Sequence, residues 1–501
     1  MCGIVGYIGR EQAAPILLEG LSRLEYREYD SAGVAVFDAQ AGTLSVHKAK
    51  GRLQVLSDQL HGGADLDSTV GVGHTRWATH GAPSDVNSHP QVSRSGKIAV
   101  VHNGIIENYA ELKGFLQSKG VPFVSETDTE VVAQLIEYFY DGDLLQAVGR
   151  VLRRIQGSYA LGILCADCPD RIVAVRKDSP LILGYGEGCN FIASDVTAIL
   201  RHTRQVGYME DGELAVLTRE GIQCYNHLMQ PIDKEIVTVD WAIDAAEKGG
   251  YEHFMFKEIM EQPEALRRCL FPRIREGEIV FEDFSLSDGY IKSMNRIYIV
   301  ACGSSYHVGM VGKYHLERLT RIPVEVALGS EFRYMDPIVD EHTLVIVISQ
   351  SGETLDTMAA LREARRLGGH ILSIVNVVGS SIARESDQVL YTWAGPEIAV
   401  ATTKAYTTQL ALLSLLALWL GKRLGTVSEE DFQAMLAAFR ELPDKMEQVL
   451  AQRDGIQYFA SQYFNHNSIF FMGRNLDYAL GLEGSLKLKE ISYIHSEAYA
   501  S

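Results

Sequence analysis

The chain has 501 residues, of which 47% are hydrophobic and 22% are charged, and this composition excludes wholesale disorder. At roughly 150 residues per domain, the length indicates about three domains. Acidic side chains outnumber basic ones by 64 to 46, for a net charge of −18. Because an acidic surface repels phosphate backbones, we expect no nucleic-acid partner, although one phosphorylated small molecule can still bind in a local pocket.

The longest apolar stretch, residues 410–420, is shorter than the ~20 residues that a membrane span requires, so it predicts a buried helix and no membrane contact. The N-terminus lacks the basic and apolar regions of a signal peptide. The seven scattered cysteines are typical of reduced thiols in the cytoplasm. Cys165 and Cys168 have no second pair to complete a zinc site, so we expect neither metal nor cofactor.

The first ~240 residues contain short β-type runs punctuated by turn residues, with few helical patterns between them. This order of elements predicts a layered α+β domain. The expected strands lie at 4–8, 33–37, 44–47, 98–102, 161–164 and 172–175, and the expected helices at 107–119 and 129–140.

The pattern lapses over 240–252, where Lys248, Gly249 and Gly250 indicate a linker, and a helix-like segment follows at 256–269. From about Asn295, fully apolar strands alternate with helices, which predicts a parallel, doubly wound sheet. A weak internal echo near Asp454 indicates the start of a second such unit, with one strand and one helix. The predicted divisions are 1–240, a linker and lead-in helix at 241–285, 286–450 and 451–501.

The second residue is a candidate nucleophile. If Met1 is removed, Cys2 gains a free α-amine, whose ordinary pKa of about 7.7–8.0 suits it to take the proton of its own thiol. The alternative is a small buried residue at the start of a strand.

Three other clusters carry groups that such a nucleophile needs. Arg76, in a glycine-bounded loop at 73–81, offers a planar fork for a carboxylate, or the loop is an ordinary one anchored by Trp77. Asn103 and Gly104 offer two donors for an oxyanion hole, or form a hairpin turn. Asp128 can bind an ammonium group, or its segment caps a helix. Together they describe a pocket for an α-amino acid with a side-chain amide.

The segments MCGIVGYIG, YREYDSAG, GHTRWATHG, VHNGIIEN and SETDTE resemble the class II glutamine amidotransferases, which are N-terminal nucleophile hydrolases with layered α/β/β/α domains. The resemblance implies that Cys2 attacks glutamine and that Asn103 and Gly104 hold the oxyanion. It further implies a channel gate at Trp77 and glutamine contacts at Arg76, Thr79, His80 and Asp128.

Two serine-rich turns, at 303–305 and 349–354, follow predicted strands and open helices. Their hydroxyls and free backbone N–H groups suit a phosphate, although ordinary helix capping is the alternative. Neither turn matches a P-loop or a dinucleotide-binding turn.

The segments CGSS, SQSGET, ATTKA and LEGSLKLKEISYIHSEAYA resemble sugar isomerase (SIS) domains. Both halves together, over residues 1–501, are similar to the glutamine–fructose-6-phosphate aminotransferase family. The resemblance implies that ammonia from L-glutamine passes through a channel to D-fructose 6-phosphate and yields glucosamine 6-phosphate, in a homodimer formed through the SIS domains. Sugar-phosphate contacts are implied at Ser304, Ser305, Ser349, Gln350, Ser351, Thr354, Val400 and Ala401.

Glu490 matches the carboxylate that moves a proton between carbons 1 and 2, and Lys487 matches an assisting lysine. Their spacing of three residues places them on one helix face, where a solvated charged face is the alternative.

The family pattern includes a later segment, with a ring-opening histidine and a Schiff-base lysine, that these 501 residues lack. We therefore expect a fragment or an incomplete gene product that hydrolyses glutamine more readily than it aminates the sugar. Glu28 also replaces a usual glycine. The alternatives are a glutaminase-only fragment, an amidotransferase with another acceptor, and a sugar-phosphate-sensing protein.

Overall fold

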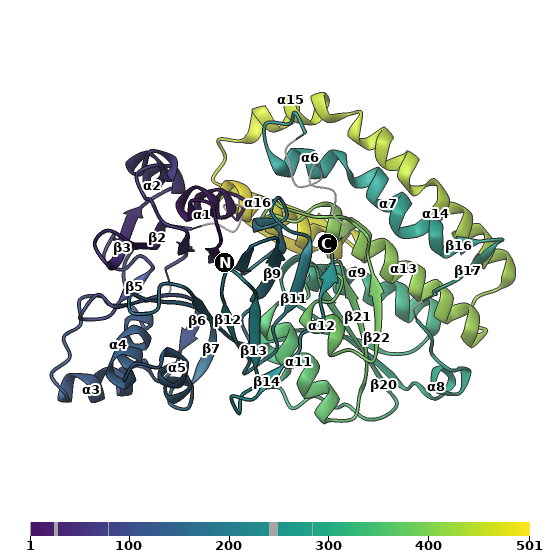
Figure 1. Ribbon diagram of the computed structural model, residues 1–501. Helices are drawn as coiled ribbons and strands as arrows, with labels where there is room; N and C mark the ends of the chain where they lie inside the picture. The colour runs from purple at the N-terminus through teal and green to yellow at the C-terminus, as the bar shows by residue number, and fades with distance from the viewer. Residues whose placement is uncertain (1, 25–28, 79, 240–248, 283) are drawn as a thin grey trace. The chain divides into compact units, whose positions relative to one another are not determined.

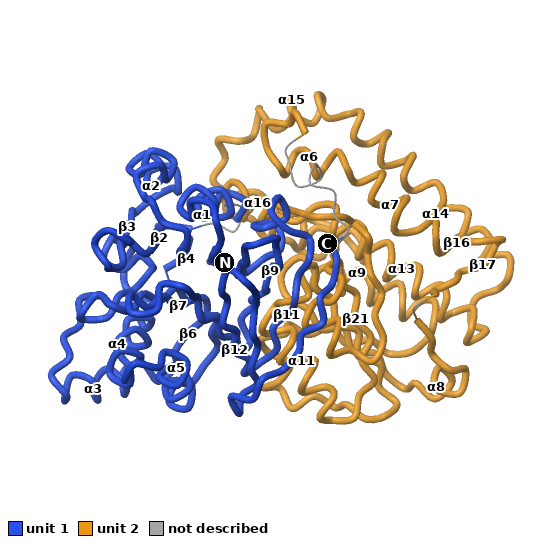
Figure 2. The backbone as a smooth tube through the Cα atoms, viewed as in Figure 1, with its two compact units in different colours: residues 1–243 blue, residues 244–501 orange. Residues whose placement is uncertain are grey.

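The computed structural model describes residues 2–24, 29–78, 80–239, 249–282 and 284–501. Glu28, Thr79 and residues 240–248 of the expected linker, Lys248 among them, therefore lie outside the described residues. The chain divides into two compact units, residues 1–243 (unit 1) and residues 244–501 (unit 2), which Figure 2 distinguishes by colour.

Unit 1 contains two large sheets whose paired strands are antiparallel. Sheet 1 has the order β15 (Val237–Thr238), β11 (Gln205–Tyr208), β9 (Ile182–Gly186), β10 (Cys189–Ala193), β1 (Gly3–Ile8), β4 (Val70–Arg76), β2 (Ser31–Asp38), β3 (Thr43–Lys50). Sheet 2 has the order β14 (Pro231–Ile232), β13 (Ile222–Tyr225), β12 (Leu214–Leu217), β8 (Ile172–Lys177), β7 (Gly157–Cys165), β6 (Ile98–Ile106), β5 (Gln91–Val92).

Three apolar cores separate the layers of unit 1. One lies between the two sheets and includes Ile4, Val72 and Val101. A second packs α1 (Ala13–Ser22) and α2 (Leu53–Gln59) against sheet 1, and a third packs α3 (Tyr109–Ser118), α4 (Thr129–Phe139) and α5 (Leu144–Leu152) against sheet 2. Strands buried on both faces explain this arrangement, and the expected α/β/β/α layering is confirmed (Figure 1).

Unit 2 is built on a five-stranded parallel sheet with helices on both faces, which confirms the expected doubly wound sheet. Its order is β19 (Val324–Leu328), β18 (Arg296–Ala301), β20 (Thr343–Ser349), β21 (His370–Val375), β22 (Gln388–Tyr391). One face packs on α9 (Gly303–Thr320) and α13 (Lys404–Leu424), and the other on α10 (Gly329–Phe332), α11 (Leu355–Arg366) and α12 (Ser381–Arg384).

The segment expected as one helix at 256–269 forms two, α6 (Phe254–Met260) and α7 (Gln262–Leu270). Pro263 lies in the first turn of α7, where its missing N–H costs no hydrogen bond. The further elements of unit 2 are β16 (Ile274–Arg275), β17 (Glu278–Ile279), α8 (Asp288–Ser293), α14 (Glu429–Leu450) and α15 (Arg453–Tyr463).

The last part of the chain holds two strands, so the expectation of a single strand and helix after residue 454 is wrong. β23 (Ser468–Gly473) and β24 (His495–Ala500) pair in parallel around α16 (Leu476–Ser492). The sequence of β24, HSEAYA, lacks the apolar run that marks the other parallel strands, and this hides it from a hydrophobicity pattern. Among the described residues, no helix is both long and apolar enough to cross a membrane.

Candidate active site

Pairing of β1 with β4 places Cys2 beside the end of β4, because Gly3 lies opposite Thr75. The backbone N–H of Trp77 donates to Cys2 Sγ at 3.1 Å. Burial raises the pKa of the Cys2 thiol above its ordinary value of 9.0, and this effect outweighs the opposing one of the Trp77 N–H. The thiol is therefore protonated near neutral pH and needs a base to become a nucleophile.

Asn103 and Gly104 lie inside β6, opposite Ala160 and Tyr159 of β7. The alternative of a hairpin turn at these residues is therefore wrong. Asn103 Nδ2 donates to the carbonyl oxygen of Cys2 at 3.1 Å. Gly104 has φ of 123°, and a Cβ there would lie 2.1 Å from the carbonyl oxygen of Ser158, so no other residue fits.

Arg76 is a buried cation with a free donor. The residue is 3% exposed, and Nη2 donates to the carbonyl oxygens of His80 and Gly81. Nη1 is buried and has no hydrogen-bond partner among the described residues. A buried unpaired N–H of a guanidinium is costly, and an anionic ligand such as a carboxylate would satisfy it.

Asp128 is buried next to β6. Its Oδ2 accepts the N–H of Ile106 at 2.8 Å and lies 4.0 Å from His102 Nδ1. Its side chain makes no capping bond to α4, whereas Thr127 Oγ1 accepts the N–H of Glu130. The carboxylate is therefore not used as a helix cap, and its proposed contact with an ammonium group stays a prediction.

Sequence reasoning missed two residues of this region. Asp30 Oδ2 accepts the N–H of Ala78 at 2.5 Å, which fixes the loop after β4. His74, within the same quoted motif as Arg76, reaches from β4 to β6 and bonds Asn103. Both residues stood in quoted motifs, but neither hydrogen bond has a local sequence pattern, because each joins segments far apart in the chain. Trp77 is 45% exposed, and its role as a channel gate stays a prediction.

In unit 2, the two serine-rich turns follow neighbouring parallel strands. From β18 the chain passes to β19 on one side of it and then crosses to β20 on the other side. The carboxyl ends of β18 and β20 therefore flank a topological switch point. Such a point is where open α/β sheets bind ligands. Residues 303–305 open α9 after β18, and residues 349–354 connect β20 to α11.

The turn after β20 is tightly built. Ser349 Oγ accepts the N–H of Gly352 at 3.0 Å and lies 3.1 Å from Thr354 Oγ1. Gly352 has φ of 67°, and a Cβ there would lie 2.0 Å from Ser380 Oγ. Ser351 Oγ accepts the N–H of Glu353 at 3.2 Å. The turn thus has a fixed backbone.

The turn after β18 is tied to the helix that covers it. Ser305 Oγ donates to Gln409 Oε1 of α13 at 3.1 Å, and Gln409 Nε2 is buried with no partner in the described part of the chain. Ser304 is buried beside it. Gln350 lies in the other turn and is half-buried.

The loop that carries Val400 and Ala401 is held by acidic residues at the start of unit 2. The buried Glu258 carboxylate accepts the N–H groups of Ile398 at 2.5 Å and Ala399 at 3.1 Å. Burial and the neighbouring Glu397 raise the pKa of Glu258 to about 7. Glu261 pairs with Lys404 at 2.6 Å. Val400 is 54% exposed, whereas Ala401 is nearly buried.

Lys487 and Glu490 form an ion pair on α16, as their spacing predicts. Lys487 Nζ also lies 3.5 Å from Glu483 Oε1. Glu483 Oε2 in turn lies 2.8 Å from Nδ1 of His307 on α9. Sequence reasoning missed His307 and Glu483. Within the described ranges, no hydrogen bond or ion pair joins Lys487 or Glu490 to the serine turns themselves.

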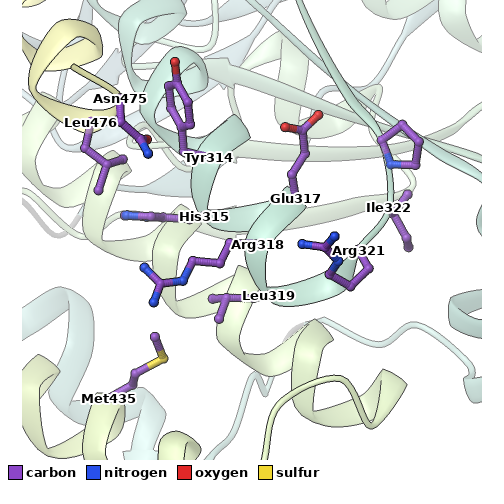
Figure 3. Close-up of a pocket in the computed structure, with 11 residues that line it drawn as sticks. Tyr314, His315, Glu317, Arg318, Leu319, Arg321, Ile322, Met435, Asn475 and Leu476 are labelled. Atoms are coloured by element: carbon purple, nitrogen blue, oxygen red, sulfur yellow. The ribbon is translucent and has the colours of Figure 1, made fainter.

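A cavity of about 640 Å³ lies at the far end of α9, away from the turn after β18. Figure 3 shows its lining, with Tyr314, His315 and Arg318 on α9 and Asn475 and Leu476 at the start of α16. None of the residues expected to contact a substrate lines it, so it is separate from the serine turns.

Two domain models match the chain, one in each of its two units. Residues 74–201 match the glutamine amidotransferase domain model, and residues 290–419 match the SIS domain model. The glutamine–fructose-6-phosphate aminotransferase (isomerizing) of Caldanaerobacter subterraneus is 56% identical over 100% of this chain and 82% of its own length. That of Clostridium acetobutylicum is 54% identical with the same coverage.

Among solved structures, the C-terminal domain of glucosamine-fructose-6-phosphate aminotransferase from Francisella tularensis is 38% identical over 51% of this chain and 72% of that chain, with a TM-score of 0.49. The identity of 54–56% to the two curated relatives over the whole chain, together with both domain models, shows the family. The chain therefore belongs to the glutamine–fructose-6-phosphate aminotransferase (isomerizing) family.

Proposed function

We propose that this chain transfers the amide nitrogen of L-glutamine to D-fructose 6-phosphate, giving D-glucosamine 6-phosphate and L-glutamate. The observation that carries the proposal is the convergence of Cys2, Asn103 and Arg76 at one end of two packed sheets. Support also comes from the match of the whole chain to relatives named glutamine–fructose-6-phosphate aminotransferase (isomerizing).

In unit 1, Cys2 Sγ attacks the side-chain amide carbon of glutamine, and the α-amine of Cys2 takes the thiol proton once Met1 is removed. Asn103 Nδ2 and the N–H of Gly104 stabilise the oxyanion. The C–N bond then breaks, ammonia leaves, and water cleaves the thioester to release glutamate. Arg76 binds the glutamine carboxylate through its free Nη1 and Asp128 binds the ammonium group, with Thr79 and His80 as further contacts.

In unit 2, the turns at 303–305 and 349–354 bind the sugar phosphate, and Val400 and Ala401 line the sugar. Ammonia adds to carbon 2 of fructose 6-phosphate and water leaves, which forms an imine. Glu490 then removes a proton from carbon 1 and returns it to carbon 2, with Lys487 assisting. No residue in this scheme requires a metal or cofactor.

We further propose a homodimer formed through unit 2 and a cytoplasmic location. The first is supported by exposed apolar side chains such as Phe459 and Phe470, which association would cover. The second is supported by the seven cysteines, all of them free thiols. Sedimentation at several concentrations measures the assembly.

The decisive experiment uses glutamine labelled with ¹⁵N at the side-chain amide. With fructose 6-phosphate present, mass spectrometry should find ¹⁵N in glucosamine 6-phosphate, and Cys2→Ala should lose both glutamate release and label transfer. Measuring both half-reactions on one sample also tests the expectation that hydrolysis exceeds amination. Glutamine hydrolysis without any binding of fructose 6-phosphate would contradict the proposal for unit 2.

A further inference from the structure

His74 links the two sheets of unit 1 behind the proposed oxyanion hole. It is fully buried on β4, and its Nε2 lies 2.9 Å from Asn103 Oδ1 and 2.9 Å from the carbonyl oxygen of His102. On the other side of the same amide, Asn103 Nδ2 lies 3.1 Å from the carbonyl oxygen of Cys2.

The direction of these hydrogen bonds follows from which atoms can donate. A carbonyl oxygen only accepts, so the Asn103 atom that faces the Cys2 carbonyl is the NH₂ nitrogen. Asn103 Oδ1 therefore faces His74. Because Oδ1 and the His102 carbonyl both accept, the His74 hydrogen resides on Nε2.

The surroundings of His74 keep this single form. Burial lowers the pKa of His74 to about 3 and outweighs the opposing effect of the hydrogen bonds to Asn103 and to the His102 carbonyl, while the charges of His102 and Arg76 lower it further. The ring of His89 lies 4.3 Å from that of His74, and burial also holds the pKa of His89 well below its ordinary value. His74 Nδ1 is buried without a partner among the described residues, so no neighbour favours a hydrogen there.

We propose that His74 is a positioning residue for amide hydrolysis: its Nε2–H holds Asn103 in the one amide orientation that turns Nδ2 toward Cys2 and the oxyanion. Without this donor the Asn103 amide can rotate by half a turn, which would place the Oδ1 lone pairs against the developing negative charge. The proposal rests on the proposed oxyanion role of Asn103.

The test compares His74→Leu, which removes the donor, with His74→Gln, whose side-chain NH₂ can replace it. We expect His74→Leu to lower kcat for glutamine hydrolysis by about 10²–10³-fold, the loss typical of an oxyanion donor, with KM for glutamine changed less than about threefold. His74→Gln should recover most of kcat. Labelling of Cys2 by an electrophilic glutamine analogue counts the folded sites, and His47→Leu, a half-buried histidine on β3, is the matched control.

A double-mutant cycle separates positioning from general structural support. Since His74 acts through Asn103, His74→Leu should add little to the loss in an Asn103→Ala background. Equal fold-losses in both backgrounds, or an unchanged kcat in His74→Leu, would overturn the inference. The ¹⁵N shifts of His74 give a readout without turnover: a protonated Nε2 and a bare Nδ1 support the inference, and the reverse tautomer sinks it. A wild-type chain that hydrolyses no glutamine while its His74 has the expected tautomer would instead contradict the proposed function.

Discussion

The two units build their candidate sites in different ways. In unit 1, the site residues lie on or beside strands in the interior of a sheet sandwich, where His74, Arg76 and Asn103 are all buried. In unit 2, they lie on turns and helix ends beyond one edge of a parallel sheet, and Val400 and Glu490 are exposed. Antiparallel strands can bring distant side chains face to face, whereas parallel strands offer their carboxyl ends.

This difference decides what a substitution should do. The polar groups of unit 1 hold one another across sheets, so removing one changes the chemistry of its neighbours. The turns of unit 2 are fixed by backbone geometry and by carboxylates that accept backbone N–H groups, so a substitution there should alter ligand binding and local stability.

The largest effect should come from Cys2→Ala. Removal of the proposed nucleophile should lower glutamine hydrolysis by about 10³-fold or more. Calorimetric binding of fructose 6-phosphate should stay unchanged, because that site lies in unit 2. Residual hydrolysis within tenfold of wild type would show that another group attacks the amide.

Arg76→Lys should have the next largest effect. Lysine keeps the charge but loses the planar fork and the free Nη1, so KM for glutamine should rise by about 30–100-fold. Steady-state hydrolysis measures it. Arg94→Lys, at an exposed arginine of unit 1, serves as the control. A change confined to kcat would contradict a carboxylate contact.

Gly352→Ala should lower the free energy of unfolding of unit 2. The added Cβ would meet Ser380 Oγ at 2.0 Å, and the combined clash and positive φ should cost about 2–3 kcal/mol. Gly425→Ala is the matched control, because its φ of 72° is similar but a Cβ there meets nothing within 4 Å, so only about 1 kcal/mol is expected. Chemical denaturation measures both, and equal losses would show that the clash is relieved.

Glu258→Gln should have the smallest effect, and one that depends on pH. Because the folded-state pKa of Glu258 is raised from 4.5 to about 7, the folded chain retains a proton that the unfolded chain loses between these values. Its contribution to stability therefore falls as pH rises from about 4.5 to 7 and is level above. Wild type should lose stability relative to Glu258→Gln across this window, which should appear as a fall in the Tm of wild type that the variant does not share.

Thermal unfolding at pH 5 and pH 8 measures this difference, with Glu264→Gln, at an exposed carboxylate of α7, as the control. A stability difference between wild type and Glu258→Gln that is independent of pH would mean that Glu258 does not titrate in this range.

Strong patterns in the sequence predicted much of the fold. The apolar runs at 98–102 and 172–175 became the cores of β6 and β8, since burial on both faces requires continuous apolar residues. β24 escaped because its sequence lacks an apolar run, whereas the break between α6 and α7 was marked by Pro263, because proline is favoured in the first turn of a helix and not in its interior.

The candidate sites were predictable where one local motif held them. Arg76 and Asn103 stood in recognisable segments, whereas the His74–Asn103 bond joins two sheets and the His307–Glu483 pair joins residues 176 positions apart. Such contacts depend on tertiary structure, which no periodicity encodes.

The His307–Glu483 pair has a consequence for substrate length. Ser304 and Ser305 begin the helix that carries His307, and Glu483 shares a helix with Lys487 and Glu490. The proposed phosphate-binding serines and the proposed base are therefore held at a fixed spacing by two helices that this pair joins. Under the proposed chemistry, this fixed spacing should exclude a pentose phosphate, because a sugar with one carbon fewer cannot reach the phosphate site and the base at the same time.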